Sequence, residues 1–299
     1  MREKLSDTER LNNILKITPP LKPKEWRKNI IIIIISIIVL LWAFNGSKFR
    51  ITELITGVPA LISTINRMFP PDFSEIMNLS SYEIKSFSDI FTEQWWNNIF
   101  PQTIIGATIQ TIQMALAGTF IAMILSFPIS FLAAQNTSPH PIIYYIIRGL
   151  LNFLRTIPDL ALGLIFVSAV GLGSFAGTMA LSIHTTTVLA KLLSEAIENI
   201  DEGIVEAIKS TGARYFQVIS FAIVPQILPD FISFTLYRFE TNIRSASVLG
   251  LIGAGGIGYL LNTSFRTFQF QKAASIILIL IILVMTVDYI SAKLRKMII

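Results

Sequence analysis

The chain has 299 residues, of which 53% are hydrophobic and only 14% are charged, and its formal net charge is +5. Soluble proteins average about 25% charged residues, so this composition indicates a membrane protein. The basic residues gather beside hydrophobic runs rather than along one soluble face, which argues against nucleic acid as a partner. The chain has no cysteine and only two histidines, His140 and His184, so it has no disulfide and no metal site is expected.

A first transmembrane helix is expected over residues 29–45, where the run from Ile30 to Phe44 contains Ser36 as its only polar side chain. The tail before it, residues 1–28, is rich in lysine and arginine and is therefore expected in the cytoplasm. Because this polar tail is long and no small-residue cleavage site follows, the run is predicted to stay as an anchor rather than act as a cleaved signal.

The next segment, residues 46–101, has more acidic than basic side chains and is expected to be an extracytoplasmic loop. Apolar residues recur at helical spacing from Ile51 to Phe69, opposite a polar face that includes Glu53 and Asn66. This pattern predicts an amphipathic helix that lies on the outer face of the membrane. A helix that packs on its own loop is an equally open alternative.

Residues 102–299 are expected to form a core of five further transmembrane helices, with a cytoplasmic loop over residues 195–229. The expected spans are residues 103–134, 142–170, 177–196, 231–251 and 273–292. Six spans place both termini in the cytoplasm, which agrees with the basic residues that follow the last span. The predicted fold class is therefore an all-α, polytopic transmembrane bundle in the lipid bilayer of a cell membrane.

The cytoplasmic loop has the pattern of two short helices. A first helix is expected from Glu206, a break at Gly212, and a second helix from Tyr215 that ends at Pro225 and Pro229. Such a pair has too little apolar surface to form a domain, so we expect a partner protein on its exposed faces. The alternative is a simple connector between two spans.

The same loop resembles the EAA loop of binding-protein-dependent ABC importer permeases, which reads Glu-Ala-Ala, three residues, Gly, nine residues, and Ile-x-Leu-Pro. The matching residues are Glu206, Ala207, Gly212 and Pro225. Small or apolar residues replace the usual ones at three positions, Ile208, Ala222 and Val224. The resemblance implies that the loop docks into a separate ATPase subunit through Glu206, Ala207, Gly212, Ala213 and Pro225.

Longer stretches resemble one branch of that superfamily, the phosphonate importer permeases, which have a methionine-permease-like fold. They read RTIPDLALGLIFVSAVGLGSFAG, SIHTTTVLAKLLSEAIENID, LYRFETNIRSASVLGLIGAGGIG and VDYISAKLR, and the resemblance runs from about Trp95 to Arg295. It implies a type I ABC importer permease of a prokaryotic membrane that translocates phosphonate or a related phosphorus oxyanion. The implied partners are a second copy in a homodimer, an ATPase dimer that binds ATP and magnesium, and an extracytoplasmic phosphonate-binding protein.

No cofactor is expected in this chain, because no P-loop of the form G-x-x-x-x-G-K-[ST] occurs in it. The run from Gly253 to Gly258 formally matches the dinucleotide pattern G-x-G-x-x-G, but the required strand, helix and acidic residue are missing around it. A flexible outer turn is expected instead, whose Gly255 and Gly256 allow close helix approach or gate movement.

Charged residues inside membrane spans need an explanation, because each costs several kcal/mol unless it is paired or in contact with water. The residues concerned, all candidates for the translocation path, are Arg155, Asp159, Arg238, Glu240 and Arg244. One interpretation is pairing, as the spacing of Glu240 and Arg244 suggests, with Arg148 and Arg155 on a shared face. The other is that some arginines border a wet path for an anion. His184 is expected to be a hydrogen-bonded packing residue.

Other functions remain open alternatives at this point. A related permease could carry another small solute, and a stand-alone secondary transporter or channel would have a different mechanism. Such a transporter should contain inverted repeats or acidic residues in a proton relay, and the spans contain few acids. An intramembrane enzyme would need a nucleophile and a base on facing spans, and the sequence indicates no such pair.

Overall fold

The computed structural model describes residues 23–74 and 103–298, and every regular element within these ranges is helical. The expected all-α class is therefore confirmed. The chain divides into two compact units, residues 1–63 and 64–299, which we describe separately.

The first unit contains α2 (Pro23–Gly46) and the beginning of α3 (Ile51–Met68). The segment Lys28–Gly46 of α2 is long and apolar enough to cross a membrane, which agrees with the expected first span. Helix α3 confirms the amphipathic helix predicted from the apolar spacing, and Glu53 lies in its first turn, where a negative charge is favourable. The location of α3 on the membrane surface stays a prediction.

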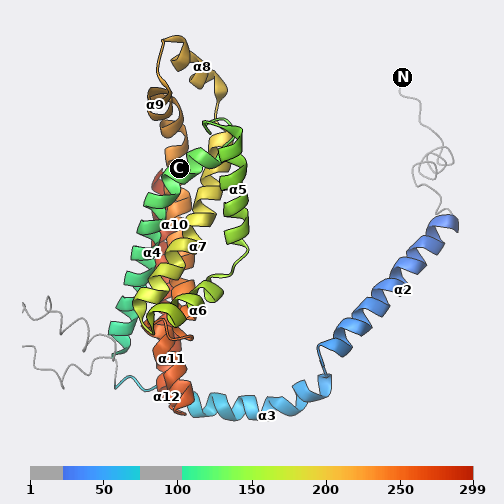
Figure 1. The fold of residues 1–299 in the computed structure, drawn as a ribbon. Coiled ribbons are helices and arrows are strands. Elements are labelled where there is room, and N and C mark those ends of the chain that lie inside the picture. The colour runs from blue at the N-terminus through green and yellow to red at the C-terminus, as the bar shows by residue number, and fades with distance from the viewer. Residues whose placement is uncertain (1–22, 75–102, 299) are drawn as a thin grey trace, which may run out of the picture. The chain divides into compact units, whose positions relative to one another are not determined.

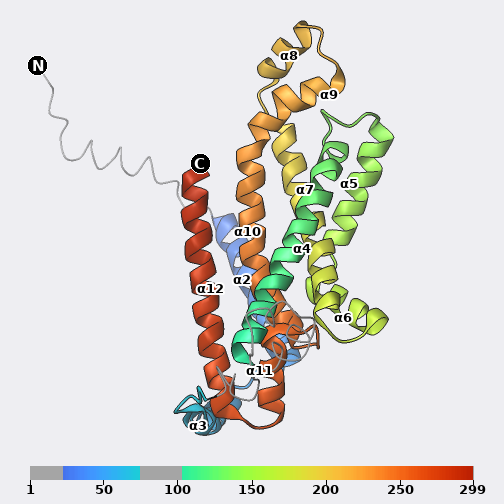
Figure 2. The same ribbon diagram turned by 90° about the vertical axis from the view of Figure 1, so that its left-hand side faces the viewer.

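The second unit is a bundle of long helices with short helices at both ends (Figure 1). Its elements in chain order are α4 (Ile104–Ala133), α5 (Pro141–Arg155), α6 (Asp159–Val170), α7 (Ser174–Glu198), α8 (Glu202–Ser210), α9 (Tyr215–Val218), the π-helix η5 (Ile219–Ile223), α10 (Val224–Gly250), α11 (Gly256–Arg266) and α12 (Phe270–Ile298). Helices α8 and α9 lie at one end of the bundle and α11 lies at the other (Figures 1 and 2). We call these the α8–α9 end and the α11 end.

The core of the bundle contains a chain of polar contacts through three helices. The Thr185 hydroxyl of α7 donates to Oδ1 of Asn242 at 2.9 Å, and Nδ2 of Asn242 on α10 donates to Thr119 of α4 at 2.8 Å. Asn242 is 1% exposed. Hydrogen bonds of this kind hold helices together where hydrocarbon surrounds them, so Asn242 links α4, α7 and α10.

Four helical segments among the described residues are long and apolar enough to cross a membrane. They are Lys28–Gly46, Ile104–Ala133, Tyr215–Gly250 and Phe270–Met297, and the bent pair α5 and α6 would make a fifth. Helix α7, which covers the fourth expected span, is too polar to meet the same criterion. Its threonine hydroxyls find partners within the helix, as Thr186 does at the Ser182 carbonyl at 2.6 Å, or on α10, as Thr185 does at Asn242.

The span expected over residues 142–170 consists of two helices, because the chain bends by 86° between α5 and α6. Pro158 has no N–H with which to continue α5, and Thr156 closes that helix by donating its hydroxyl to the Phe153 carbonyl at 2.7 Å. Helix α6 then begins at Asp159 in a new direction.

Two further expectations about helix ends are also corrected. Pro225 and Pro229 do not end a helix, because α9, the π-helix and α10 form one continuous segment, Tyr215–Gly250. Pro225 has no N–H to donate within the helix. The π-turn accommodates this, because the Val224 N–H just before it bonds five residues back to the Ile219 carbonyl. The glycine-rich turn is shorter than predicted, because α11 begins at Gly256.

Candidate functional site

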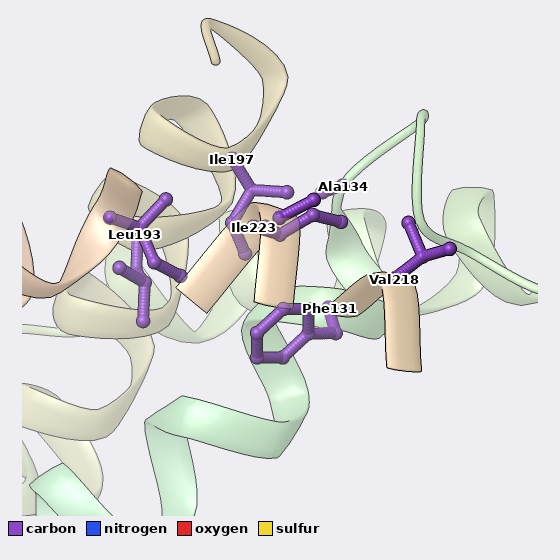
Figure 3. Packing of buried hydrophobic residues seen from close by; sticks show 8 residues of the cluster. Phe131, Ala134, Leu193, Ile197, Val218 and Ile223 are labelled. Atoms are coloured by element: carbon purple, nitrogen blue, oxygen red, sulfur yellow. The ribbon is translucent and has the colours of Figure 1, made fainter. Parts of the chain in front are cut away.

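The inner face of the predicted coupling loop is fixed to the bundle by a buried apolar cluster (Figure 3). Its members come from α4, α7 and the segment from α9 to α10: Phe131, Ala134, Leu193, Ile197, Val218, Ala222, Ile223 and Ile227. Each fully buried aliphatic side chain contributes about 1.5–3 kcal/mol relative to an exposed one. The loop is therefore packed firmly against α4 and α7.

Hydrogen bonds add to this attachment. The Asp201 carboxylate caps α8 by accepting from the Gly203 N–H at 2.8 Å, and the Asp201 N–H donates to Oε1 of Gln226 at 2.9 Å. The Tyr215 hydroxyl donates to the Thr137 carbonyl in the connection between α4 and α5. Both ends of the loop are thus held to neighbouring elements.

The turn between α8 and α9 confirms the predicted helix, turn, helix arrangement. Gly212 has a φ of +82°, and its N–H donates to the Lys209 carbonyl at 3.0 Å. This is the left-handed conformation with which glycine commonly ends a helix. Glu206 and Ala207 are exposed on α8, and Pro225 is exposed at the start of α10, whereas Ala213 is half-buried against the apolar cluster.

The outer face of the same loop exposes large apolar side chains. Phe216 is 78% exposed and Phe221 is 69% exposed, and Ile204 of α8 is 43% exposed. A small hollow of about 170 Å³ beside α8 is lined by residues that include Glu206 and Lys209. A surface with exposed aromatic side chains next to charged ones is typical of a protein docking site.

Ion pairs in the bundle show which charges are structural. Arg244 bonds to Glu240 at 2.8 Å and to Asp288 at 2.7 Å, and Arg295 bonds to Glu240 at 2.7 Å. The predicted pairing of Glu240 with Arg244 is confirmed. Asp288 and Arg295 of α12 were not predicted as partners, because sequence spacing indicates contacts within one helix only. We call these four residues the α10–α12 ion network.

The predicted pairing face of Arg148 and Arg155 is only half correct. Arg148 forms an ion pair with Glu198 of α7 and a hydrogen bond to the Tyr144 hydroxyl at 3.0 Å. Within the described part of the chain Arg155 forms no ion pair, although it lies on the same helix. A separate pair joins Lys191 and Glu195 of α7 at 3.2 Å.

Four charged or ionisable side chains around the bend between α5 and α6 influence one another electrostatically. They are Arg155, Asp159, His184 and Arg238, which we call the arginine cluster. Within residues 23–74 and 103–298, Nε of Arg238 and Nδ1 of His184 are buried and have no hydrogen-bond partner. His184 interacts with the Ile157 backbone, which agrees with the expected hydrogen-bonded packing residue, although its Nδ1 is left without a partner among the described residues.

The glycine turn is a tightly packed corner. The Gly256 N–H donates to Oε1 of Gln110 at 2.9 Å, and a Cβ on Gly256 would lie 2.5 Å from the Thr111 hydroxyl. A Cβ on Gly258 would lie 1.8 Å from the Ser247 carbonyl. The predicted close helix approach is confirmed. The flexibility of the turn and a gating role for Gly255 and Gly256 stay predictions.

A polar hollow at the α11 end was not predicted from the sequence. It has a volume of about 750 Å³, and its lining includes Arg67, Asp72, Phe268 and Gln271. The Asp72 carboxylate accepts a hydrogen bond from the Ser74 N–H at 2.9 Å, which holds the pKa of this carboxyl below its usual value. The Ser275 hydroxyl of α12 donates to the Asp72 carbonyl, so this segment is attached to the bundle.

Known proteins resemble the chain in sequence and in fold. It is 37% identical over 271 residues to the phosphite transport system permease protein PtxC of Stutzerimonas stutzeri, covering 91% of this chain and 90% of that protein. It is 35% identical over 254 residues to the phosphate-import permease protein PhnE of Mycolicibacterium smegmatis, covering 85% of this chain and 43% of that protein.

The fold is similar to that of a chain in a crystal form of the MetNI methionine ABC transporter, solved in an inward facing conformation. The TM-score is 0.58 at 19% identity, and the match covers 66% of this chain and 96% of that chain. This likeness confirms the expected fold, the methionine-permease-like fold of type I ABC importer permeases. Residues 126–298, which include the loop and the last helices, match the family described as binding-protein-dependent transport system inner membrane component. The chain therefore belongs to this family of transport-system membrane proteins.

Proposed function

We propose that the chain is the membrane-spanning subunit of an ATP-driven, binding-protein-dependent importer that moves phosphonate or a related phosphorus oxyanion into the cell. Two relatives that are more than a third identical over most of this chain are named for phosphite and phosphate transport, which supports this substrate class. The proposed partners are a second copy of the chain, a cytoplasmic ATPase dimer that binds ATP and magnesium, and an extracytoplasmic binding protein.

The coupling mechanism is supported by the difference between the two faces of the loop over residues 195–229. Its inner face is packed against α4 and α7, while Phe216 and Phe221 remain exposed on its outer face. When an ATPase bound to that outer face moves, the force passes directly into α4 and α7, because the loop is clamped to both. A loosely attached connector could not transmit such a movement.

Co-purification with the ATPase tests this mechanism. Gly212→Val should reduce the amount of ATPase that co-purifies, because a β-branched residue resists the left-handed conformation, whereas Gly212→Asn should retain it. Phe216→Ala and Glu206→Lys should reduce retention as well, since they alter the exposed face. Phe268→Ala removes a similarly exposed ring at the α11 end and serves as the control. Full retention and uptake by the Gly212, Phe216 and Glu206 variants would show that the loop is a connector.

We place the α8–α9 end in the cytoplasm and the α11 end outside, with both termini cytoplasmic. The basic residues Lys293 and Lys296 near the end of α12 support this orientation. Because the chain has no cysteine, single cysteines can test it directly. A membrane-impermeant thiol reagent should label Gln269→Cys in intact cells and should label Ser210→Cys only after the membrane is opened. The reverse pattern would invert the topology.

The transported oxyanion is best identified on the partner binding protein. Calorimetric titration with phosphite, phosphate and methylphosphonate should show a clear preference among these three ions. Binding of none of them would shift the proposal to a permease for another small solute.

A further inference from the structure

Three groups of charges lie along the bundle, and two of them are balanced. The α10–α12 ion network contains two carboxylates and two guanidinium groups that are bonded to one another. Arg148 is likewise balanced by Glu198. The arginine cluster contains two guanidinium groups, one carboxylate and one imidazole, so it carries excess positive charge. Its charges cannot be explained by pairing alone.

Unused hydrogen-bonding atoms also distinguish the arginine cluster. Nε of Arg238 and Nδ1 of His184 are the buried side-chain nitrogen and oxygen atoms without a partner in the part of the chain that the structure describes. A guanidinium N–H that is removed from water and left unbonded is costly, so it calls for an explanation, and a bound ion is one such explanation. Arg155 is exposed beside the bend, which leaves the cluster accessible from the bundle surface.

The bend between α5 and α6 explains how the arginine cluster forms inside the bundle rather than at its end. Pro158 stops α5, so Arg155 lies on the last turn of that helix while Asp159 begins α6 after the 86° bend. At about 1.5 Å per residue, Arg155 lies ~20 Å from the start of α5, which is more than half of a hydrocarbon core about 30 Å thick. An exposed arginine at this depth requires a water-lined surface rather than lipid.

We propose that Arg155 and Arg238, together with His184, form a transient binding station for a tetrahedral oxyanion within the translocation path. This inference rests on the proposed function and adds the intramembrane site to it. The two guanidinium groups supply charge and directed N–H donors, which suit phosphate, phosphite or phosphonate oxygens. Asp159 reduces the excess charge of the cluster, which keeps binding weak enough for the ion to leave.

Phosphorus-31 NMR of methylphosphonate with the purified full-length protein in lipid nanodiscs measures such weak binding. The wild-type protein should broaden the methylphosphonate signal in a saturable way. Arg155→Gln and Arg238→Gln should each raise the dissociation constant about tenfold, as expected for the loss of one charge-assisted contact. Arg155→Lys should recover part of the affinity, because lysine keeps the positive charge but lacks the forked pair of N–H donors of a guanidinium group. Arg266→Gln removes an exposed arginine at the α11 end and should bind like wild type.

Two results would overturn the station: no saturable broadening by the wild-type protein, or equal affinity in the wild type and both glutamine variants. Arg155 is exposed, so its variants separate lost binding from a folding defect at Arg238. Uptake of radiolabelled phosphite or methylphosphonate by cells that lack the gene tests the proposed function separately. Uptake that depends on this chain, without saturable broadening of the methylphosphonate signal, would overturn the binding station but not the proposed function. Specific broadening without chain-dependent uptake would leave an anion site and sink the proposed function.

Discussion

The α10–α12 ion network and the arginine cluster both contain arginine and acidic side chains, but they differ in how far these charges are paired. In the network every charge is bonded to an opposite charge, and Glu240 receives both Arg244 and Arg295. In the cluster, Nε of Arg238 is buried and has no partner among the described residues. The comparison teaches that pairing holds helices together in the network, whereas the excess charge of the cluster needs another explanation, for which we propose a ligand. Thermal unfolding of purified variants in detergent tests this distinction, because the two groups should respond in opposite directions.

The largest loss of stability is expected for Arg244→Ala. The Arg244 side chain is 44% exposed, so we reduce the cost of breaking a fully buried pair to about 2 kcal/mol. The unfolding midpoint and the yield in the membrane should both fall. Rescue should come from Asp288→Ala, because that double variant leaves the Glu240–Arg295 pair intact. Combination with Glu240→Ala should rescue less, because Asp288 and Arg295 then both lose their bonded partner. Equal rescue by both would show that the network is not arranged as described.

A smaller loss is expected for Arg148→Ala, at about 1 kcal/mol, because Arg148 pairs with one carboxylate, whereas Arg244 pairs with two. The Glu198 carboxylate keeps one other contact, since it also accepts from the Gln135 N–H at 2.9 Å. The double variant with Glu198→Gln is the control and should unfold close to the single variant. A change as large as that of Arg244→Ala would mean that pairing at the bundle end matters as much as in its interior.

Arg238→Met should have the opposite sign. Methionine fills a similar volume without a buried donor, so we expect unchanged stability or a gain of up to about 1 kcal/mol. The measurement is the same unfolding midpoint, compared with Arg244→Met, which should be lowered. A clear destabilisation of Arg238→Met would show that the arginine cluster is structural.

The smallest effect on stability is expected for Arg155→Gln. This exposed residue forms no ion pair among the described residues, so its free energy of unfolding should change by no more than about 0.5 kcal/mol. Uptake in cells should nevertheless fall. Normal stability combined with normal uptake would remove Arg155 from the translocation path.

Sequence alone determined the elements whose signals are local. The apolar run of α2, the amphipathic spacing of α3 and the helix, turn, helix pattern around Gly212 all appear in the structure, although α8 begins at Glu202 rather than at the expected Glu206. These features depend on side-chain periodicity and on the conformational freedom of one glycine, which short stretches of chain contain in full. The contact between Glu240 and Arg244 was predicted for the same reason, because both lie on one helical face.

Tertiary structure decided the features that depend on contacts between distant segments. The sequence indicated no bend within the span expected over residues 142–170, whereas the chain bends by 86° near Pro158. It predicted helix ends at Pro225 and Pro229, where the helix continues. A proline removes one hydrogen bond in either case. Packing by neighbouring helices determines whether the helix bends at that point or continues without the hydrogen bond.

The charged residues follow the same rule. Asp288 lies on α12 and reaches Arg244 on α10 only because the two helices pack together. The excess charge of the arginine cluster likewise comes from residues on α5, α6, α7 and α10, which no spacing along the chain relates. Local periodicity therefore determined which helices exist, and packing between helices decided which charges are paired and which are not.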